Sequence, residues 1–197
     1  FISTLHPSVT LSLTDTAHIK KYFRKRIKSL HNSAGTFLIW FVMKDKAFPF
    51  LNQISFKAES EKVISSKMNA HRNFMFYTPY SGKKGEHARI FKVMQFMQFN
   101  EVKKWAEKES GKRGNEYKSF KRGIVQKFIA EFESIFPGFE DMIESYYTSS
   151  PLSFASYTGT PFGSAYGIVH DHRKFTETTV PLRTKLINLY LGGQSIH

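Results

Sequence analysis

The sequence contains no cysteine, so disulfide bonds and thiolate metal sites are excluded. It has no apolar run near the roughly 18 residues that a membrane-spanning helix needs. The Gly-x-Ser-x-Gly elbow of hydrolases, the phosphate-loop Gly-Lys-Ser/Thr pattern and the Gly-x-Gly-x-x-Gly dinucleotide motif are all absent. These absences remove several common enzyme classes, and the lack of cysteine fits a cytoplasmic protein.

What the chain has in excess is aromatic residues and positive charge. The 20 Phe, 9 Tyr and 2 Trp make up 16% of its 197 residues, a length that supports one domain with a full core. Most of these rings are expected to fill the core, and a subset is expected to face a bulky apolar ligand. The sequence begins with Phe1 and shows no leader pattern, from which we expect a fragment or a trimmed product.

The formal net charge is +13, and its Lys and Arg gather in three places: 20–28, 83–89 and 103–122. A basic surface can bind nucleic acid, an anionic membrane or an anionic cofactor. Two of the runs lie on segments with amphipathic helical spacing, where charge is usually the solvated side. No nucleic-acid motif accompanies them, so we expect no nucleic-acid partner, while a peripheral membrane contact stays open.

Hydrophobic spacing predicts several strands and a few helices. Strands are expected over 9–13, 36–43, 53–57, 73–80, 89–99, 144–149 and 186–191, although the spacing of the polar residues in 89–99 would also suit a helix. Helices are expected over 19–30, 101–109 and 116–136, the last with Phe120, Ile124, Phe128, Phe132 and Ile135 on one stripe. The segment 151–174 is expected to be irregular. Because the elements do not alternate strictly, the pattern predicts an α+β fold with a mixed, mainly antiparallel sheet packed against several helices.

One loop stands out by its glycines and aromatic residues. Gly159, Gly163 and Gly167 lie four residues apart, and glycine permits unusual backbone angles and the close approach of a flat ligand. Tyr157 and Tyr166 could stack on such a ligand or hydrogen-bond to it. On residue types alone, a purely structural loop is the favoured interpretation.

Two further features follow that loop. His170 and His172 lie two apart and would need a third ligand to hold a metal, so we expect no metal site, and a role of His170 as a base has little support. The predicted strand 186–191 runs into Gly192 and Gly193, a pattern that usually feeds a phosphate-binding helix start. No set of catalytic residues can be assembled from the sequence.

The segments 157–167 (YTGTPFGSAYG) and 188–197 (NLYLGGQSIH) resemble the C-terminal region of a family of FAD-dependent oxidoreductases, that of phytoene desaturase, carotenoid isomerase and all-trans-retinol 13,14-reductase (retinol saturase). The stretches at His6-Pro7 and around Phe136-Pro137-Gly138 are similar to the same family. The resemblance extends along the whole chain, and its last fifty residues carry the specific motifs.

The resemblance implies an enzyme that desaturates, saturates or isomerises a conjugated polyene, with FAD as cofactor and NAD(P) left open. It implies that residues 1–185 form a substrate-binding domain and that 186–197 begin the strand returning to an FAD domain supplied by other segments of the parent chain. The family pattern maps cofactor contacts onto Tyr157, Gly159, Gly192, Gly193 and Gln194. Substrate contacts are expected at Phe162, Tyr166 and His170.

The points at which this sequence differs from the family pattern lead to further predictions. Without a Gly-x-Gly-x-x-Gly motif, the adenine and pyrophosphate part of the FAD site has no counterpart in these residues. We therefore expect that this chain alone retains no FAD and is inactive. Two alternatives stay open: a non-catalytic module that binds an apolar ligand, and a basic nucleic-acid-binding domain.

Overall fold

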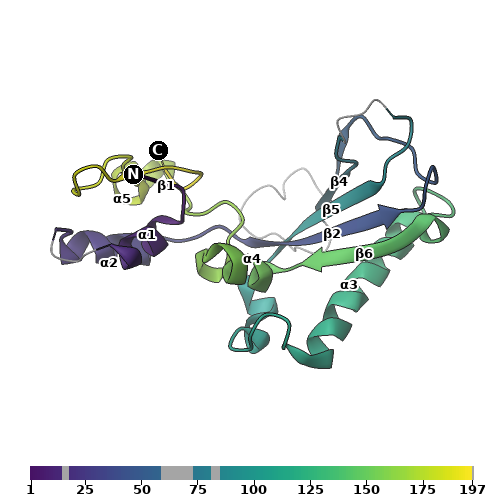
Figure 1. Cartoon of the computed structure of the whole chain (residues 1–197), viewed down its shortest axis with the longest axis horizontal. Helices are drawn as coiled ribbons and strands as arrows, with labels where there is room; N and C mark the ends of the chain where they lie inside the picture. The colour runs from purple at the N-terminus through teal and green to yellow at the C-terminus, as the bar shows by residue number, and fades with distance from the viewer. Residues whose placement is uncertain (15–17, 59–72, 81–84, 197) are drawn as a thin grey trace. The chain divides into compact units, whose positions relative to one another are not determined.

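The chain folds into two compact units, seen in a computed structural model that describes residues 1–14, 18–58, 73–80 and 85–196. The first unit joins Phe1–Gly35 to Pro151–His197, and the second unit is Thr36–Ser150. Helices and sheets occur in separate stretches of the chain (Figure 1), so the predicted α+β class is confirmed. No described helix is long and apolar enough to cross a membrane.

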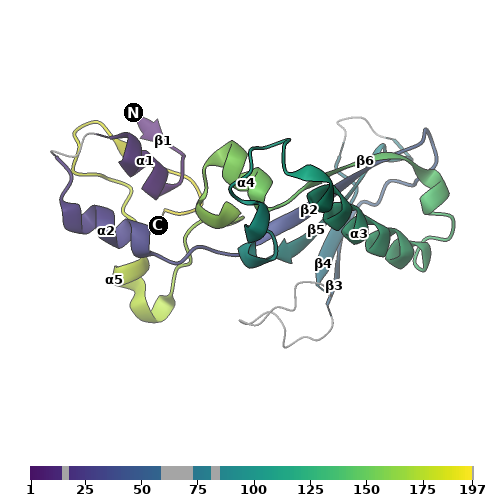
Figure 2. The same ribbon diagram turned by 90° about the horizontal axis from the view of Figure 1, so that it is seen from below.

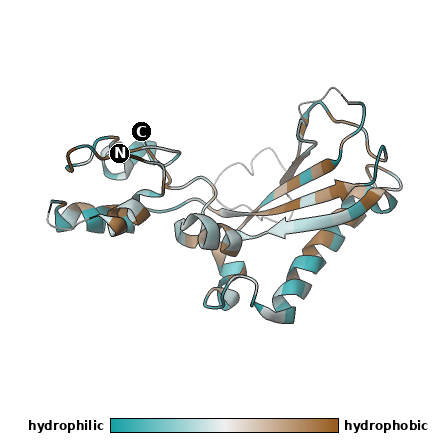
Figure 3. Ribbon diagram, in the orientation of Figure 1, coloured by the Kyte–Doolittle hydropathy of each residue, from teal (hydrophilic) through white to brown (hydrophobic). Residues whose placement is uncertain are grey.

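The second unit is built on a five-stranded sheet with the order β3-β4-β5-β2-β6. Its strands are β2 (Gly35–Met43), β3 (Ile54–Lys57), β4 (Phe74–Tyr77), β5 (Ile90–Met97) and β6 (Ile143–Ser149). The pairs β3–β4, β4–β5 and β2–β6 are antiparallel. The central strand β2 is mostly hydrophobic and the edge strand β6 is more polar (Figure 3), as expected for buried and solvated strands.

One face of this sheet is covered by the long helix α3 (Gly114–Glu133), which Figure 2 shows lying along the strands. Phe91 from β5 and Phe132 from α3 lie 4.8 Å apart by ring centroid, and Phe74 and Phe128 lie 5.0 Å apart. Both contacts are edge-to-face, the arrangement that aromatic pairs prefer. Many of the phenylalanines therefore form the core, and the predicted stripe of α3 is confirmed at Ile124, Phe128 and Phe132.

The first unit contains α1 (Pro7–Leu13), α2 (Lys21–Ser29), α4 (Pro151–Thr158) and α5 (Phe175–Thr178). A two-stranded parallel sheet joins β1 (Ile2–Ser3) to β7 (Tyr190–Leu191). The small core gathers buried side chains from distant parts of the chain: Leu11, Ile19, Ile27, Ile168, Val180 and Leu191. Short 3-10 turns lie at Phe99–Glu101, Lys103–Trp105, Glu140–Met142, Pro161–Gly163 and His172–Lys174.

Four local predictions were wrong. Residues 9–13 lie in α1, because Pro7 occupies the first turn and Pro7, Thr10 and Leu11 are buried at helical spacing. Residues 151–158 form α4, again with proline at the start, where its missing N–H costs nothing. The helix expected over 101–109 is a pair of 3-10 turns that bury Trp105. Within 186–191, only Tyr190–Leu191 is a strand.

Candidate functional site

The two segments that carry the family resemblance lie next to each other in the first unit. The Gln194 side-chain Nε2 donates to the Ala165 carbonyl oxygen at 2.9 Å. The Ile168 backbone N–H donates to Ser195 Oγ at 3.2 Å in a buried position. The glycine-rich loop and the residues after β7 are thus joined by hydrogen bonds, although they are far apart in the sequence.

Glycine is required where these segments meet. Gly167 has a φ of +69°, and a Cβ there would lie 2.0 Å from Ser195 Oγ. Gly163 has a φ of +62°, and a Cβ there would lie 1.9 Å from the Pro151 carbonyl oxygen. Both positions combine a left-handed backbone with a contact that no side chain could make. These two glycines therefore serve the packing of the loop itself.

A pocket of about 50 Å³ lies where the loop and the end of the chain meet the N-terminal residues. This volume is less than the liquid share of two waters at about 30 Å³ each, so it cannot enclose the ring system of a flavin. These residues could supply only one edge of an FAD site that other segments complete. The pocket is lined by Thr4, Leu5, His6, Thr160, Gly167, Gly192, Gln194 and Ser195.

Of the predicted cofactor residues, Gly192 and Gln194 line this pocket. Gly193 has a φ of +92° and packs against the Thr4 carbonyl oxygen, 3.3 Å from the position of its absent Cβ. Gly159 has a φ of +67° and faces Val9. Tyr157 is 82% exposed at the end of α4, outside the pocket.

The predicted substrate residues are not gathered at the pocket. Phe162 is 62% exposed with a φ of +57°, and Tyr166 is 50% exposed. His170 is half-buried in the following segment, and none of the three lines the pocket. Within the described part of the chain, no group of three His, Cys, Asp or Glu could hold a metal ion.

His6, which lines the pocket, is held in one tautomer. The Ser8 backbone N–H donates to His6 Nδ1, so the ring proton is on Nε2. Nε2 donates to Asn32 Oδ1 at 2.7 Å, and the Asn32 amide is oriented by donating to the Leu30 carbonyl oxygen. Burial lowers the pKa of His6, against the opposing effect of the Asn32 hydrogen bond. His6 is therefore a neutral donor and helix cap near pH 7.

A second candidate site is the sheet face opposite α3, which sequence reasoning did not identify. In β5, the odd-numbered residues from Phe91 to Met97 are buried toward α3, and the even-numbered residues are half-buried on the other side. Residues directly opposite across the antiparallel pairs share a face, which extends this surface from β5 to β4 and β3. The contact of Lys92 with Trp40 places the even-numbered residues of β2 on the same side, and their partners on β6 follow. We call it the open face: Leu38, Trp40, Val42, Ile54, Phe56, Met75, Tyr77, Ile90, Lys92, Met94, Phe96, Ser145, Tyr147 and Ser149.

The open face is mostly apolar, exposed on the edge strands β3 and β6 and half-buried in the middle, with Leu38 buried. Phe56 is 74% exposed, Tyr147 is 66% exposed and Ile54 is 58% exposed. Contiguous apolar surface of this kind marks a site for a ligand, a membrane or another protein segment more often than a bare solvent surface.

Among the described residues of the open face, Lys92 on β5 is the one cation. Lys92 Nζ lies 5.5 Å from the ring centroid of Trp40 and 5.5 Å from that of Tyr77. Both distances are within the range of a cation–π interaction, so the two rings hold the ammonium group in place. The signal in the sequence was the polar Lys92 at an otherwise apolar position of the strand. Chemically, the face offers flat apolar contacts and a positively charged hydrogen-bond donor held between two rings.

The basic run on α2 is a surface feature, whereas Arg113 in the run at 103–122 is buried. On α2, Lys21, Lys25 and Lys28 are exposed while Ile27 is buried. Lys83 and Lys84 lie outside the described residues. The charge on α2 is thus the solvated side of an amphipathic helix, as its spacing predicted.

Comparison with known proteins shows one consistent similarity, and no model of a protein family matches the chain. The all-trans-retinol 13,14-reductase of Homo sapiens is 33% identical over 95 residues, which cover 47% of this chain and 16% of the human protein. The enzyme of the same name from Macaca fascicularis is 35% identical over 95 residues, and that from Rattus norvegicus is 31% identical over 101 residues. The chain spans about a sixth of the length of these relatives. Over about half of its length, therefore, this chain is similar to all-trans-retinol 13,14-reductases.

Proposed function

We propose that this chain is the substrate-side part of an FAD-dependent oxidoreductase that acts on a retinoid-like polyene by saturation, desaturation or isomerisation. The observation that carries the proposal is the similarity to proteins named as all-trans-retinol 13,14-reductases. The similar proteins supply the reaction class, and the open face supplies a surface on which such a substrate can lie.

The open face suits a conjugated polyene for physical reasons. Such a molecule is flat and long, has no charge and offers almost nothing to hydrogen-bond, so its binding depends on buried apolar area. Trp40, Tyr77 and Phe56 come from three strands of one sheet and present aromatic rings to the same side. Lys92 would then meet the hydroxyl end of a retinol-like ligand.

The redox chemistry would belong to the flavin. In our proposal, Gly192, Gly193 and Gln194 contribute an edge to the FAD site, and the nucleotide is gripped mainly by other segments of the parent protein. This chain contributes the substrate surface and its orientation, and NAD(P) is a further candidate cofactor.

Retinol binding to the chain tests the substrate half of the proposal. We expect all-trans-retinol to bind saturably, followed by its own fluorescence, and Phe56→Lys to weaken binding about tenfold, because roughly 1.5–3 kcal/mol accompanies burial of a large apolar side chain. Tyr22→Lys is the matched control, since Tyr22 is 77% exposed, lies on α2 in the first unit and is not one of the open-face residues. Retinol binding that Phe56→Lys leaves unchanged would contradict the assignment of the site.

Two further measurements separate the alternatives. The product of the complete reading frame that contains this chain should show a flavin absorption spectrum, and a colourless product that still binds retinol would leave an apolar-ligand module. Single-stranded DNA binding that weakens steeply with salt would instead favour a nucleic-acid-binding domain, because phosphate contacts release counterions.

A further inference from the structure

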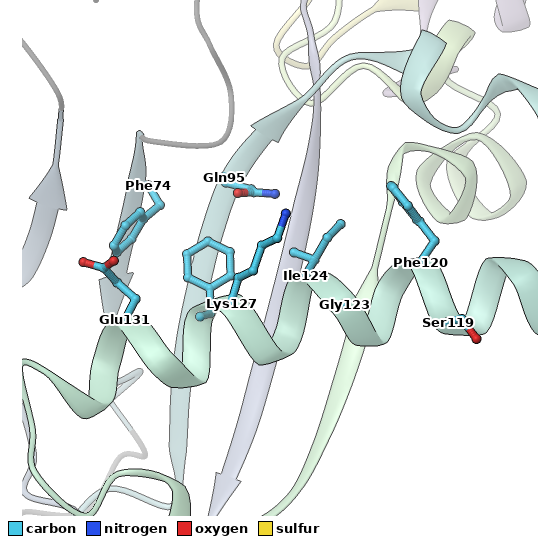
Figure 4. A pocket seen from close by; sticks show the side chains of 9 residues that line it. Phe74, Gln95, Ser119, Phe120, Gly123, Ile124, Lys127 and Glu131 are labelled. Atoms are coloured by element: carbon cyan, nitrogen blue, oxygen red, sulfur yellow. The ribbon is translucent and has the colours of Figure 1, made fainter.

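A second pocket lies on the other side of the sheet, between β4, β5 and α3, and belongs to neither site described above. Its volume is about 270 Å³, near the lower end of small-molecule sites. Phe74 and Phe128 line one part of it, and Phe120 and Ile124 another (Figure 4). These parts of the wall are apolar, and the rest of the lining is Gln95, Ser119, Gly123, Lys127 and Glu131.

Two hydrogen-bond donors converge in this pocket. Gln95 is 3% exposed on the α3 side of β5, and its Nε2 has no hydrogen-bond partner within the described part of the chain. Figure 4 shows the Lys127 side chain extending from α3 toward this amide. Buried polar groups nearly always have partners, so an unpaired amide N–H aimed into a cavity indicates an acceptor that binds there.

Lys127 is an exposed residue of α3, and the pocket lining also contains one carboxylate, that of Glu131. Glu131, one turn further along α3, already pairs with Lys57. Among the residues that the structure describes, Lys127 itself makes no ion pair. An ammonium group beside an amide N–H forms a site for an anionic oxygen, since both donate and neither accepts.

We propose that this pocket binds the carboxylate of a medium-chain fatty acid or a similar amphiphile, with its apolar chain against Phe120, Ile124 and Phe128. The carboxylate oxygens accept from Gln95 Nε2 and Lys127 Nζ. A volume of 270 Å³ is about nine water-sized groups, which sets the chain length at roughly eight to ten carbons. This site lies on the sheet face opposite the open face, so it does not depend on the proposed polyene site.

The test is a titration of the whole chain with decanoate, read by methyl NMR. We expect the Ile124 methyl signal, assigned with Ile124→Val, to shift saturably while the Ile54 signal on the open face stays in place. Lys127→Met should weaken the binding about tenfold, as expected for loss of a charge-assisted hydrogen bond. Lys118→Met, an exposed lysine of the same helix outside the pocket lining, should leave it unchanged.

A comparison with decanol shows whether the carboxylate contributes to binding or only the apolar chain does. We expect decanol to bind at least tenfold more weakly than decanoate, because a neutral hydroxyl forms weaker hydrogen bonds than a carboxylate. The proposal is overturned if decanoate leaves the Ile124 signal in place. Equal affinities of the Lys127→Met and Lys118→Met variants would overturn it as well.

Discussion

Gly167 and Ser195 are packed so closely that a single methyl group on the glycine would lie 2.0 Å from the serine Oγ. The same hydroxyl oxygen accepts the Ile168 backbone N–H, so the serine cannot move away without losing a buried hydrogen bond. This pair fastens the glycine-rich loop to the end of the chain.

The first prediction follows from that contact. Gly167→Ala should lower the free energy of unfolding of the first unit by at least about 2 kcal/mol, combining a strained φ with a steric clash. Gly159→Ala is the control, since Gly159 lies in the same unit with a positive φ of +67° and its absent Cβ would make only an ordinary contact with Val9 at 3.6 Å. Its cost should be about 1 kcal/mol, from the backbone alone. If thermal or denaturant melting shows the same loss of unfolding free energy for Gly167→Ala and for the control variant, the contact with Ser195 makes no contribution to stability.

The second prediction concerns the core of the second unit. Phe128→Asp should destabilise this unit by more than about 3 kcal/mol, because it removes a buried ring and places a carboxylate in an apolar interior. Phe128 is 6% exposed and contacts Phe74 and Phe132. Gln126→Asp, at an exposed position of the same helix, should change urea unfolding by less than about 0.5 kcal/mol. If the two variants unfold at similar urea concentrations, Phe128 is not packed in the core as described, and the placement of α3 on the sheet is contradicted.

The third prediction is a pH dependence set by His6. Its folded-state pKa is lowered by burial, so below the unfolded value of 6.5 the unfolded chain binds more protons than the folded chain. Stability is therefore fully present above about pH 7.5 and is lost as the pH falls through about 6.5 toward the folded pKa. His6→Asn keeps a helix-capping oxygen and removes the titration, so its stability should change less between these limits. Denaturant unfolding at about pH 7.5 and about pH 6.5 measures this change for both proteins. An equal change in the free energy of unfolding for the parent chain and for His6→Asn would exclude His6 as the cause.

The fourth prediction assigns a role to Lys92 on the open face. Lys92→Met should weaken binding of all-trans-retinol about tenfold, because hydrogen bonds from charged donors contribute about 1.5–3 kcal/mol. A hydrocarbon polyene without a hydroxyl should bind the variant and the parent chain equally well. If both ligands lose the same affinity in fluorescence titrations, Lys92 acts only by holding Trp40 and Tyr77 in place.

Much of the second unit could be predicted because its elements are long and patterned. Residues 36–43 are apolar on both faces, and the stripe of residues 116–136 repeats every three to four positions, so burial and local preference agree. The first unit was harder. Residues 9–13 alternate like a strand for only five positions, and the capping His6 and Pro7 outweigh that short pattern.

The candidate sites were predictable only in part. Spacing of the glycines marked the loop at 159–167, but no local pattern could show that Gly167 meets Ser195, since that contact joins distant segments. Residues 89–99 are mostly apolar, with Lys92, Gln95 and Gln98 three apart, so the sequence could not show that one side of this strand is covered by α3 and the other is the open face. That distinction depends on which element packs where, which is a property of the tertiary fold.

The most direct test of the open face as a polyene site is methyl NMR of the methionines during a titration with all-trans-retinol. Met75 and Met94 lie on the open face, whereas Met43 and Met97 are fully buried. We predict that retinol shifts the signals of Met75 and Met94 saturably and leaves those of Met43 and Met97 unchanged. Unmoved Met75 and Met94 signals at saturating retinol, or shifts confined to the buried pair, would contradict the account.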